Sequence, residues 1–161
     1  KKEAFYTTQA MWRPEPHVHI VGHWNYDKAT QKDVHVVANA DTVKLYVNDK
    51  LIGTDSEAEF GYSFSFPKVS FEAGKIKAES YVNGKLVATQ EKETVGKPVA
   101  LKLTTKTGPD GWFANGADFA LIDFEAVDAN GRRYPLDQSK VTFNVEGPAV
   151  WRGGVAGDEG D

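Results

Sequence analysis

The segment Ser80-Tyr-Val-Asn-Gly-Lys-Leu-Val-Ala88 indicates a β-rich fold for this 161-residue chain. Two runs of β-branched, aromatic and aliphatic residues flank Asn83-Gly84, and this dipeptide is the strongest short-range signal for a two-residue β-hairpin. The segment Tyr46-Val-Asn-Asp-Lys-Leu51 repeats the pattern. Too little matches outside the two hairpins to predict a solenoid, so we interpret them as one turn solution that a β-sandwich uses twice.

Further strand-like runs surround both hairpins. They cover residues 17–21, 34–38, 43–47, 51–53, 62–66, 75–82 and 86–88. About seven short strands, with a turn signal every roughly 8 to 12 residues, are typical of an immunoglobulin-like antiparallel β-sandwich. We therefore predict such a sandwich over residues 17–96.

The N-terminal residues follow a helical period instead. The residues that share one face of a helix over 1–12 are Ala4, Phe5, Thr8, Met11 and Trp12. Pro14 and Pro16 end this helix, because proline lacks a backbone N–H and disfavours the helical conformation of the residue before it. Residues 1–16 are thus a short amphipathic helix and a linker.

A second β-unit follows Gly96-Lys97-Pro98, which is the best domain boundary. Three strands are predicted at residues 99–103, 119–127 and 141–145, and a fourth at 150–151. An immunoglobulin-like sandwich needs roughly seven strands and roughly 100 residues. The fold class is therefore all-β, with two tandem immunoglobulin-like antiparallel β-sandwiches, of which the second, over residues 97–161, is expected to be incomplete.

Charge and length exclude several classes of protein. The formal net charge of −4 disfavours a surface that tracks nucleic-acid phosphates, so we expect no nucleic-acid partner. The sequence lacks an apolar run of the roughly 18 residues that a membrane-spanning helix requires. The chain is also shorter than the roughly 250 residues of a (β/α)₈ barrel. It begins with Lys1 and has its single Met at position 11, so we expect it to be part of a longer protein.

The sequence contains none of the common catalytic motifs. It has no Cys, no Gly-x-Ser-x-Gly, no phosphate-binding loop and no His-Glu-x-x-His. The spacing of its 23 acidic residues nominates no pair of catalytic carboxylates. The segments at 128–131 and 158–161 resemble pieces of calcium loops without the full ligand series, and we interpret them as a hairpin turn and a frayed end. We expect no catalytic residue and no cofactor.

All four histidines lie between positions 17 and 35. His17 and His19 share one face of a strand, a geometry that suits Zn²⁺ or Ni²⁺. Neutral histidines near Trp24 could equally form hydrogen bonds and pack at the end of a strand, and this second interpretation is favoured. We therefore predict no metal site.

Aromatic residues supply the candidate contact sites. The candidates for contacts with carbohydrate or with another domain are Trp12, His23, Trp24, Tyr26 and Trp112, because flat rings stack on the C–H face of a pyranose. Trp24 could instead plug the end of the sandwich core with Trp12 beside it, which is the commoner role of a large aromatic residue. Trp112 follows the turn-rich segment Gly108-Pro-Asp-Gly111 and is the better candidate for an exposed ring.

The N-terminal half resembles a known family. The residues that carry the resemblance are Phe5-Tyr6, Trp12-Arg-Pro14, the run from His17 to Tyr26, which includes His23-Trp-Asn25, and the run from Ala38 to Gly53. This order is similar to the region that follows the catalytic barrel in bacterial β-galactosidases of glycoside hydrolase family two. Residues 98–103, 114–122 and 127–131 resemble the next immunoglobulin-like or invasin-like domain of those enzymes. The family's Gly-Asn-Gly-Asp-type turn is replaced at residues 155–161, which indicates that the last strands are missing.

The resemblance implies that the catalytic glutamates belong to the barrel, so none can be assigned here. It also implies that the first sandwich packs against that barrel, with residues near Trp12 and His23-Trp24 at the contact. The leading hypothesis is a non-catalytic region that braces the barrel of a β-galactosidase-like enzyme and helps to shape its substrate cleft. We expect the parent to be bacterial and secreted or periplasmic.

Two other classes stay open. In a carbohydrate-binding module, Trp24, Tyr26 and Trp112 would form an exposed platform. In a bacterial immunoglobulin-like adhesin or stalk, tandem sandwiches would only act as spacers. The helix that ends in Trp12 argues against the spacer, because a spacer domain has no need of it.

Overall fold

The computed structural model describes residues 3–155. The chain divides into two compact units between Thr94 and Val95, and each is described by itself. This division lies next to the predicted boundary at Gly96.

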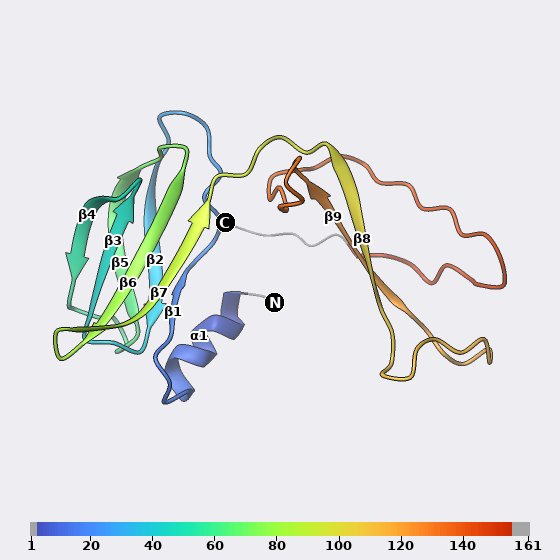
Figure 1. Cartoon of the computed structure of the whole chain (residues 1–161), viewed down its shortest axis with the longest axis horizontal. Coiled ribbons are helices and arrows are strands. Elements are labelled where there is room, and N and C mark those ends of the chain that lie inside the picture. The colour runs from blue at the N-terminus through green and yellow to red at the C-terminus, as the bar shows by residue number, and fades with distance from the viewer. Residues whose placement is uncertain (1–2, 156–161) are drawn as a thin grey trace. The chain divides into compact units, whose positions relative to one another are not determined.

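The first unit is an antiparallel β-sandwich preceded by one helix (Figure 1). Its elements are α1 (Glu3–Trp12), β1 (Val18–Ile20), β2 (Gln31–Ala38), β3 (Thr42–Val47), β4 (Lys50–Asp55), β5 (Ser63–Ser70), β6 (Lys75–Val82) and β7 (Lys85–Glu93). One sheet has the strand order β1-β2-β5 and the other β4-β3-β6-β7. All pairings are antiparallel. The prediction of a seven-stranded sandwich after a short helix is confirmed.

The core of this unit lies between the two sheets. In β3 the buried residues Val43, Leu45 and Val47 alternate with partly exposed ones, as a strand with one buried face requires. The other sheet contributes Val34 and Val36 from β2 and Phe64, Phe66 and Val69 from β5. Because these side chains are β-branched, aliphatic or aromatic, they fill the space between the pleated surfaces.

Both predicted hairpins turn as their sequences require. Asn48 and Asp49 between β3 and β4 have φ values of 48° and 65°, and Asn83 and Gly84 between β6 and β7 have 51° and 75°. Two consecutive positive φ values define the turn that matches the twist of antiparallel strands. Asn, Asp and Gly adopt this conformation most readily.

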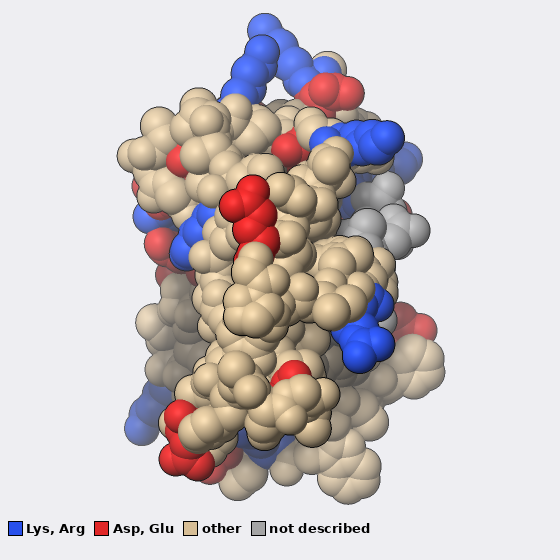
Figure 2. Space-filling model, turned by 90° about the vertical axis from the view of Figure 1, so that its right-hand side faces the viewer, with Lys and Arg blue, Asp and Glu red and all other residues tan. Residues whose placement is uncertain are grey.

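The second unit contains the hairpin of β8 (Ala100–Lys106) and β9 (Leu121–Val127). The register pairs Leu101 with Ala126 and Leu103 with Phe124, so these side chains share one face. Leu101 and Leu103 are exposed. Figure 2 shows mostly uncharged residues, with scattered charges, over the visible face. An apolar sheet face in this state is typical of a surface that another element covers.

Two sequence predictions for this unit are wrong. Residues 141–145 and 150–151 form no strand, because no neighbouring strand supplies backbone hydrogen bonds in the described part of the unit. Phe143 still packs edge-on against Phe124, with ring centroids 4.9 Å apart, and stacks on Trp151 at 4.8 Å. The apolar pattern of 141–145 therefore marks packing rather than a strand. The predicted frayed end at 158–161 lies outside the described residues.

Candidate functional site

Helix α1 contacts β1 and β2 through the face opposite to the one that the sequence pattern marks as apolar. Its bound side carries the buried Ala10, together with Tyr6, which lies over His19 of β1. The predicted apolar face points away. Trp12 is 77% exposed and Met11 is 50% exposed. The predicted packing of Trp12 beside Trp24 is wrong, because the helix is rotated about its axis relative to that expectation.

A chain of hydrogen bonds ties α1 to the sandwich. Gln90 Oε1 accepts the backbone N–H of Ile20 at 2.6 Å, so the Gln90 amide nitrogen is the donor to His19 Nδ1 at 3.0 Å. His19 therefore carries its proton on Nε2 and donates it to Glu3 Oε2 at 2.6 Å. The Tyr6 ring is stacked on His19 with centroids 3.7 Å apart. These contacts give His19 a structural role.

Burial lowers the pKa of His19 below its ordinary value of 6.5. The hydrogen bond to Glu3 opposes this shift, whereas the positive charge of Lys92 adds to it. Desolvation also lowers the pKa of His17, followed by the charge of Arg13. Both histidines therefore favour the neutral form in the folded chain.

His19 in β1 and His17, which precedes β1, serve the helix contact. His17 also stacks on Tyr6, at 6.3 Å between centroids, and its buried Nε2 atom has no hydrogen-bond partner among the described residues. Within residues 3–155, no group of three or more His, Cys, Asp or Glu side chains is arranged to hold a metal ion. His17 and His19 thus pack against α1 rather than beside Trp24.

Trp24 lies in the core, where it is 2% exposed. Its indole N–H donates to the carbonyl oxygen of Glu72 at 3.1 Å, and its ring meets Phe71 edge-on at 5.2 Å. Tyr26 is half-buried beside both rings, and His23 packs on Tyr26 at 4.6 Å. The surroundings of Trp24 fit the interpretation that it plugs the end of the core.

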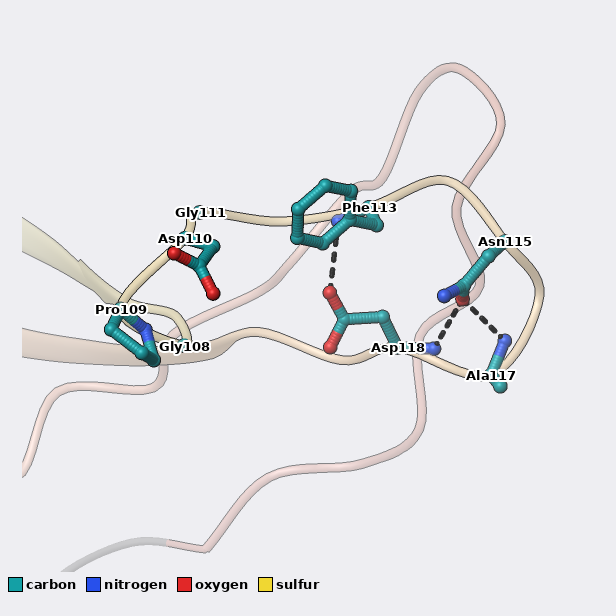
Figure 3. A pocket seen from close by; sticks show the side chains of 8 residues that line it. All are labelled: Gly108, Pro109, Asp110, Gly111, Phe113, Asn115, Ala117 and Asp118. Atoms are coloured by element: carbon teal, nitrogen blue, oxygen red, sulfur yellow. Dashed lines mark hydrogen bonds between the residues drawn. The ribbon is translucent and has the colours of Figure 1, made fainter.

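The loop between β8 and β9 presents the exposed rings of Trp112 and Phe113. It encloses a shallow depression of about 370 Å³ whose lining includes Asp110, Phe113, Asn115 and Asp118 (Figure 3). Trp112 does not line this depression. Of the five predicted contact residues, Trp112 belongs to the second unit. Within the first unit, His23, Trp24 and Tyr26 form one cluster, and Trp12 lies on a separate element, α1.

Asp128, in the predicted hairpin turn, organises the segment after β9. It is buried and accepts hydrogen bonds from the backbone N–H groups of Asn130, Arg132 and Gly96 and from the Arg132 guanidinium. Desolvation opposes the charge, but these donors outweigh it and hold the pKa of Asp128 at about 2. The donors surround its carboxylate, so this segment is a capped turn rather than a calcium loop.

Sequence reasoning did not identify the residues that hydrogen-bond to His19 or stack on it. Glu3 and Tyr6 share α1, but Glu3 lies 16 residues and Gln90 lies 71 residues from His19, and no local pattern relates these positions. For Asp110 and Asn115 a weak signal existed, since both lie in the Gly-rich segment beside Trp112.

None of the helices in the described chain has the length and apolar character needed to cross a membrane.

Comparisons with known proteins agree with the two-unit architecture. Residues 29–88 match a family described as a domain of unknown function (DUF4982), and residues 101–161 match the glycoside hydrolase family 2 C-terminal domain 5. The chain is 61% identical to a β-glucuronidase of Formosa agariphila over 95% of this chain and 16% of that relative. It is 32% identical to a β-galactosidase of Bacteroides ovatus over 91% of this chain and 17% of the relative.

Solved structures give the same result. A β-glucuronidase from glycoside hydrolase family 2 matches with a TM-score of 0.81 and 62% identity, over 84% of this chain and 14% of that one. A family 2 member from Bacteroides cellulosilyticus matches with a TM-score of 0.74 and 26% identity, over 83% and 20% of the two chains. The chain spans between 14% and 20% of the length of the curated relatives that it matches. In those proteins the corresponding region is one part of a longer chain.

Proposed function

Because this chain belongs to the C-terminal β-sandwich region of glycoside hydrolase family 2, we propose that it is a non-catalytic region that braces the catalytic domain of a longer glycosidase. The relatives are named as β-glucuronidases and β-galactosidases, so the longer protein is proposed to hydrolyse β-glycosides of these kinds. The bracing region would also contribute to the shape of the substrate cleft.

The orientation of α1 carries this proposal. A short amphipathic helix normally turns its apolar face to the domain on which it rests. Here α1 is held by the opposite face, through Glu3, Tyr6 and Ala10, and leaves Met11 and Trp12 in solvent. Covering a large apolar side chain is worth about 1.5 to 3 kcal/mol, so this face favours contact with a further apolar surface. The catalytic domain is the proposed occupant.

The surroundings of the more buried carboxylates support a non-catalytic role. Glu79 accepts hydrogen bonds from Tyr81 at 2.6 Å and pairs with Lys77 at 2.9 Å, and Asp128 is surrounded by donors. Glycoside hydrolysis uses two carboxyl groups that face a cleft. Glu79 and Asp128 are instead committed to structural partners.

The bracing role can be tested by Trp12→Ala in the longer protein that contains the catalytic domain. We expect this variant to lower the thermal midpoint of the longer protein by several degrees and to leave that of the isolated chain nearly unchanged. Phe60→Ala is the matched control, because Phe60 is 78% exposed on the same unit but lies in the loop between β4 and β5 and not on α1. An equal effect of Trp12→Ala in both proteins would contradict the proposal.

The non-catalytic role has its own test. We expect the isolated chain to release no chromophore from chromogenic β-galactosides or β-glucuronides. Turnover by the pure chain that disappears when one of its own carboxylates is replaced would overturn this part of the proposal.

A further inference from the structure

We propose that the loop between β8 and β9 is a binding site for an uncharged glycosyl residue. This inference does not depend on the bracing role, because the loop belongs to the second unit and α1 to the first. The depression in the loop has a volume of about 370 Å³, which lies at the small end of the range for ligand sites. A single pyranose ring fits a site of this size.

The frame of the site is held in place by its own hydrogen bonds. Asn115 Oδ1 accepts the backbone N–H groups of Ala117 and Asp118 at 2.9 and 2.8 Å. Asp118 Oδ2 accepts the backbone N–H of Phe113 at 2.8 Å from across the loop, as the dashed lines in Figure 3 show. These bonds fix the loop backbone at Phe113 before any ligand arrives, which reduces the entropic cost of ordering the loop on binding.

The groups that remain available suit a sugar. Phe113 is 56% exposed and offers an apolar ring to the C–H face of a pyranose. The Asp110 side chain points into the loop, as Figure 3 shows. Within the described residues, neither the Asp110 carboxylate nor the amide nitrogen of Asn115 has a hydrogen-bond partner. The Asp110 carboxylate accepts hydrogen bonds from hydroxyl groups, and the Asn115 amide nitrogen donates hydrogen bonds to them. The site can therefore satisfy both the donor and the acceptor capacity of sugar hydroxyls.

The charge of the site selects among sugars. Two carboxylates, Asp110 and Asp118, line the depression, and among the described residues no Lys or Arg lines it. Like charges repel, so a uronate, sulfate or phosphate group is disfavoured here. The site therefore differs in preference from a catalytic centre that accepts glucuronides, which are acidic.

Isothermal titration calorimetry of the whole 161-residue chain tests the proposal. The probes are neutral tetrasaccharides of galactose, glucose and xylose, with tetragalacturonate as the acidic counterpart. We expect at least one neutral probe to bind saturably and tetragalacturonate to bind at least tenfold more weakly than that probe. Absence of saturable binding by all three neutral probes, or equal binding of tetragalacturonate, would overturn the proposal.

Variants locate the site. Phe113→Ala should weaken binding of the neutral probe roughly tenfold, because it removes the stacking ring. Phe119→Ala is the control, because Phe119 is 69% exposed at the end of the same loop but does not line the depression. Asp110→Asn removes one negative charge and should reduce the difference in affinity between the neutral probe and tetragalacturonate. Circular dichroism of each variant reports whether it is folded, and unchanged binding by a folded Phe113→Ala variant would refute the site.

Discussion

His19 links a single protonation state to the position of a helix. Its Nδ1 atom must accept from Gln90, because the Gln90 oxygen is already committed to Ile20. A second proton on His19 would place two donors face to face and break this hydrogen bond. The charged groups around His19 are Glu3, which favours that proton, and Lys92, which disfavours it. Burial decides the balance toward the neutral ring.

The stability of the first unit should therefore fall in mild acid. A histidine with a lowered folded pKa contributes its full stability above the unfolded value of 6.5, and this contribution is lost as the pH falls below 6.5. Urea unfolding of the unsubstituted 161-residue chain at pH 7.5 and 5.5 should show this loss of stability. His17 shifts in the same direction, so His19→Gln should reduce the loss and the double variant with His17→Gln should nearly abolish it.

His35→Gln is the control for this experiment, because His35 is exposed on β2. The unsubstituted chain and this control should lose the same free energy of unfolding between the two pH values. If the unsubstituted chain gained stability in acid, this result would contradict the assignment of neutral histidines at the helix contact.

Asp128 makes a comparable prediction in the second unit. Replacing Asp128 by Asn leaves the shape of the side chain but removes the charge that faces the Arg132 guanidinium and three backbone donors. We expect Asp128→Asn to speed amide hydrogen exchange at Asn130 and Arg132 at least tenfold, because hydrogen bonds to a charged acceptor are stronger than those to a neutral one. Asp123→Asn is the control, because Asp123 is exposed on β9, and it should leave both rates unchanged. Equal rates in all three proteins would refute this role.

At the scale of elements, the hairpins show how far a local signal reaches. Asn83-Gly84 predicts a turn conformation without help from the rest of the chain. The turn at Asn48 depends on a distant residue as well. The Asn48 side chain accepts the backbone N–H of Lys75 at 2.9 Å and donates to the carbonyl oxygen of Ala73 at 3.1 Å, so it braces the start of β6. Gly74 lies against this side chain and has a φ of 132°.

Gly74→Ala should therefore destabilise the first unit more than Gly84→Ala. A Cβ atom at position 74 would lie 2.0 Å from Asn48 Oδ1, whereas a Cβ at position 84 would meet nothing within 4 Å. We expect Gly74→Ala to lower the free energy of unfolding by roughly 3 kcal/mol, because it strains the backbone and displaces the Asn48 side chain from its hydrogen bonds. We expect a loss of about 1 kcal/mol for Gly84→Ala. Urea unfolding measures both, and equal losses would contradict the bracing contact of Asn48.

The helix shows where sequence reasoning stops. The periodicity of Phe5, Met11 and Trp12 identifies an apolar face, and the structure has the helix, but that face is exposed. A hydrophobic pattern predicts that a face is covered by something and does not say by what. The contacts that hold α1 come from Glu3 and Tyr6 and depend on partners in β1 and β7. No spacing in the sequence relates these positions.

At the scale of the whole molecule, sequence prediction succeeded where local and global signals agree. The first sandwich has alternating strands, two hairpin turns and a family resemblance that all point to one fold, and the structure and the comparisons confirm that fold. In the second unit the apolar residues of 141–145 suggested a strand, but a strand requires a neighbour for its backbone groups. That this second sandwich is incomplete stays a prediction. The depression at Asp110 and Asn115 depends on loop conformation, which composition alone does not specify.

The proposed bracing role requires the exposed face of α1 to meet the catalytic domain of the longer protein. Hydroxyl-radical footprinting with mass spectrometry measures this most directly, because it reports the exposure of individual Trp and Met side chains. We predict that oxidation of Trp12 and Met11 is several-fold slower in the longer protein than in the isolated chain, while oxidation of Phe60 is the same in both. Equal oxidation of Trp12 and Met11 in the two proteins would contradict the claim.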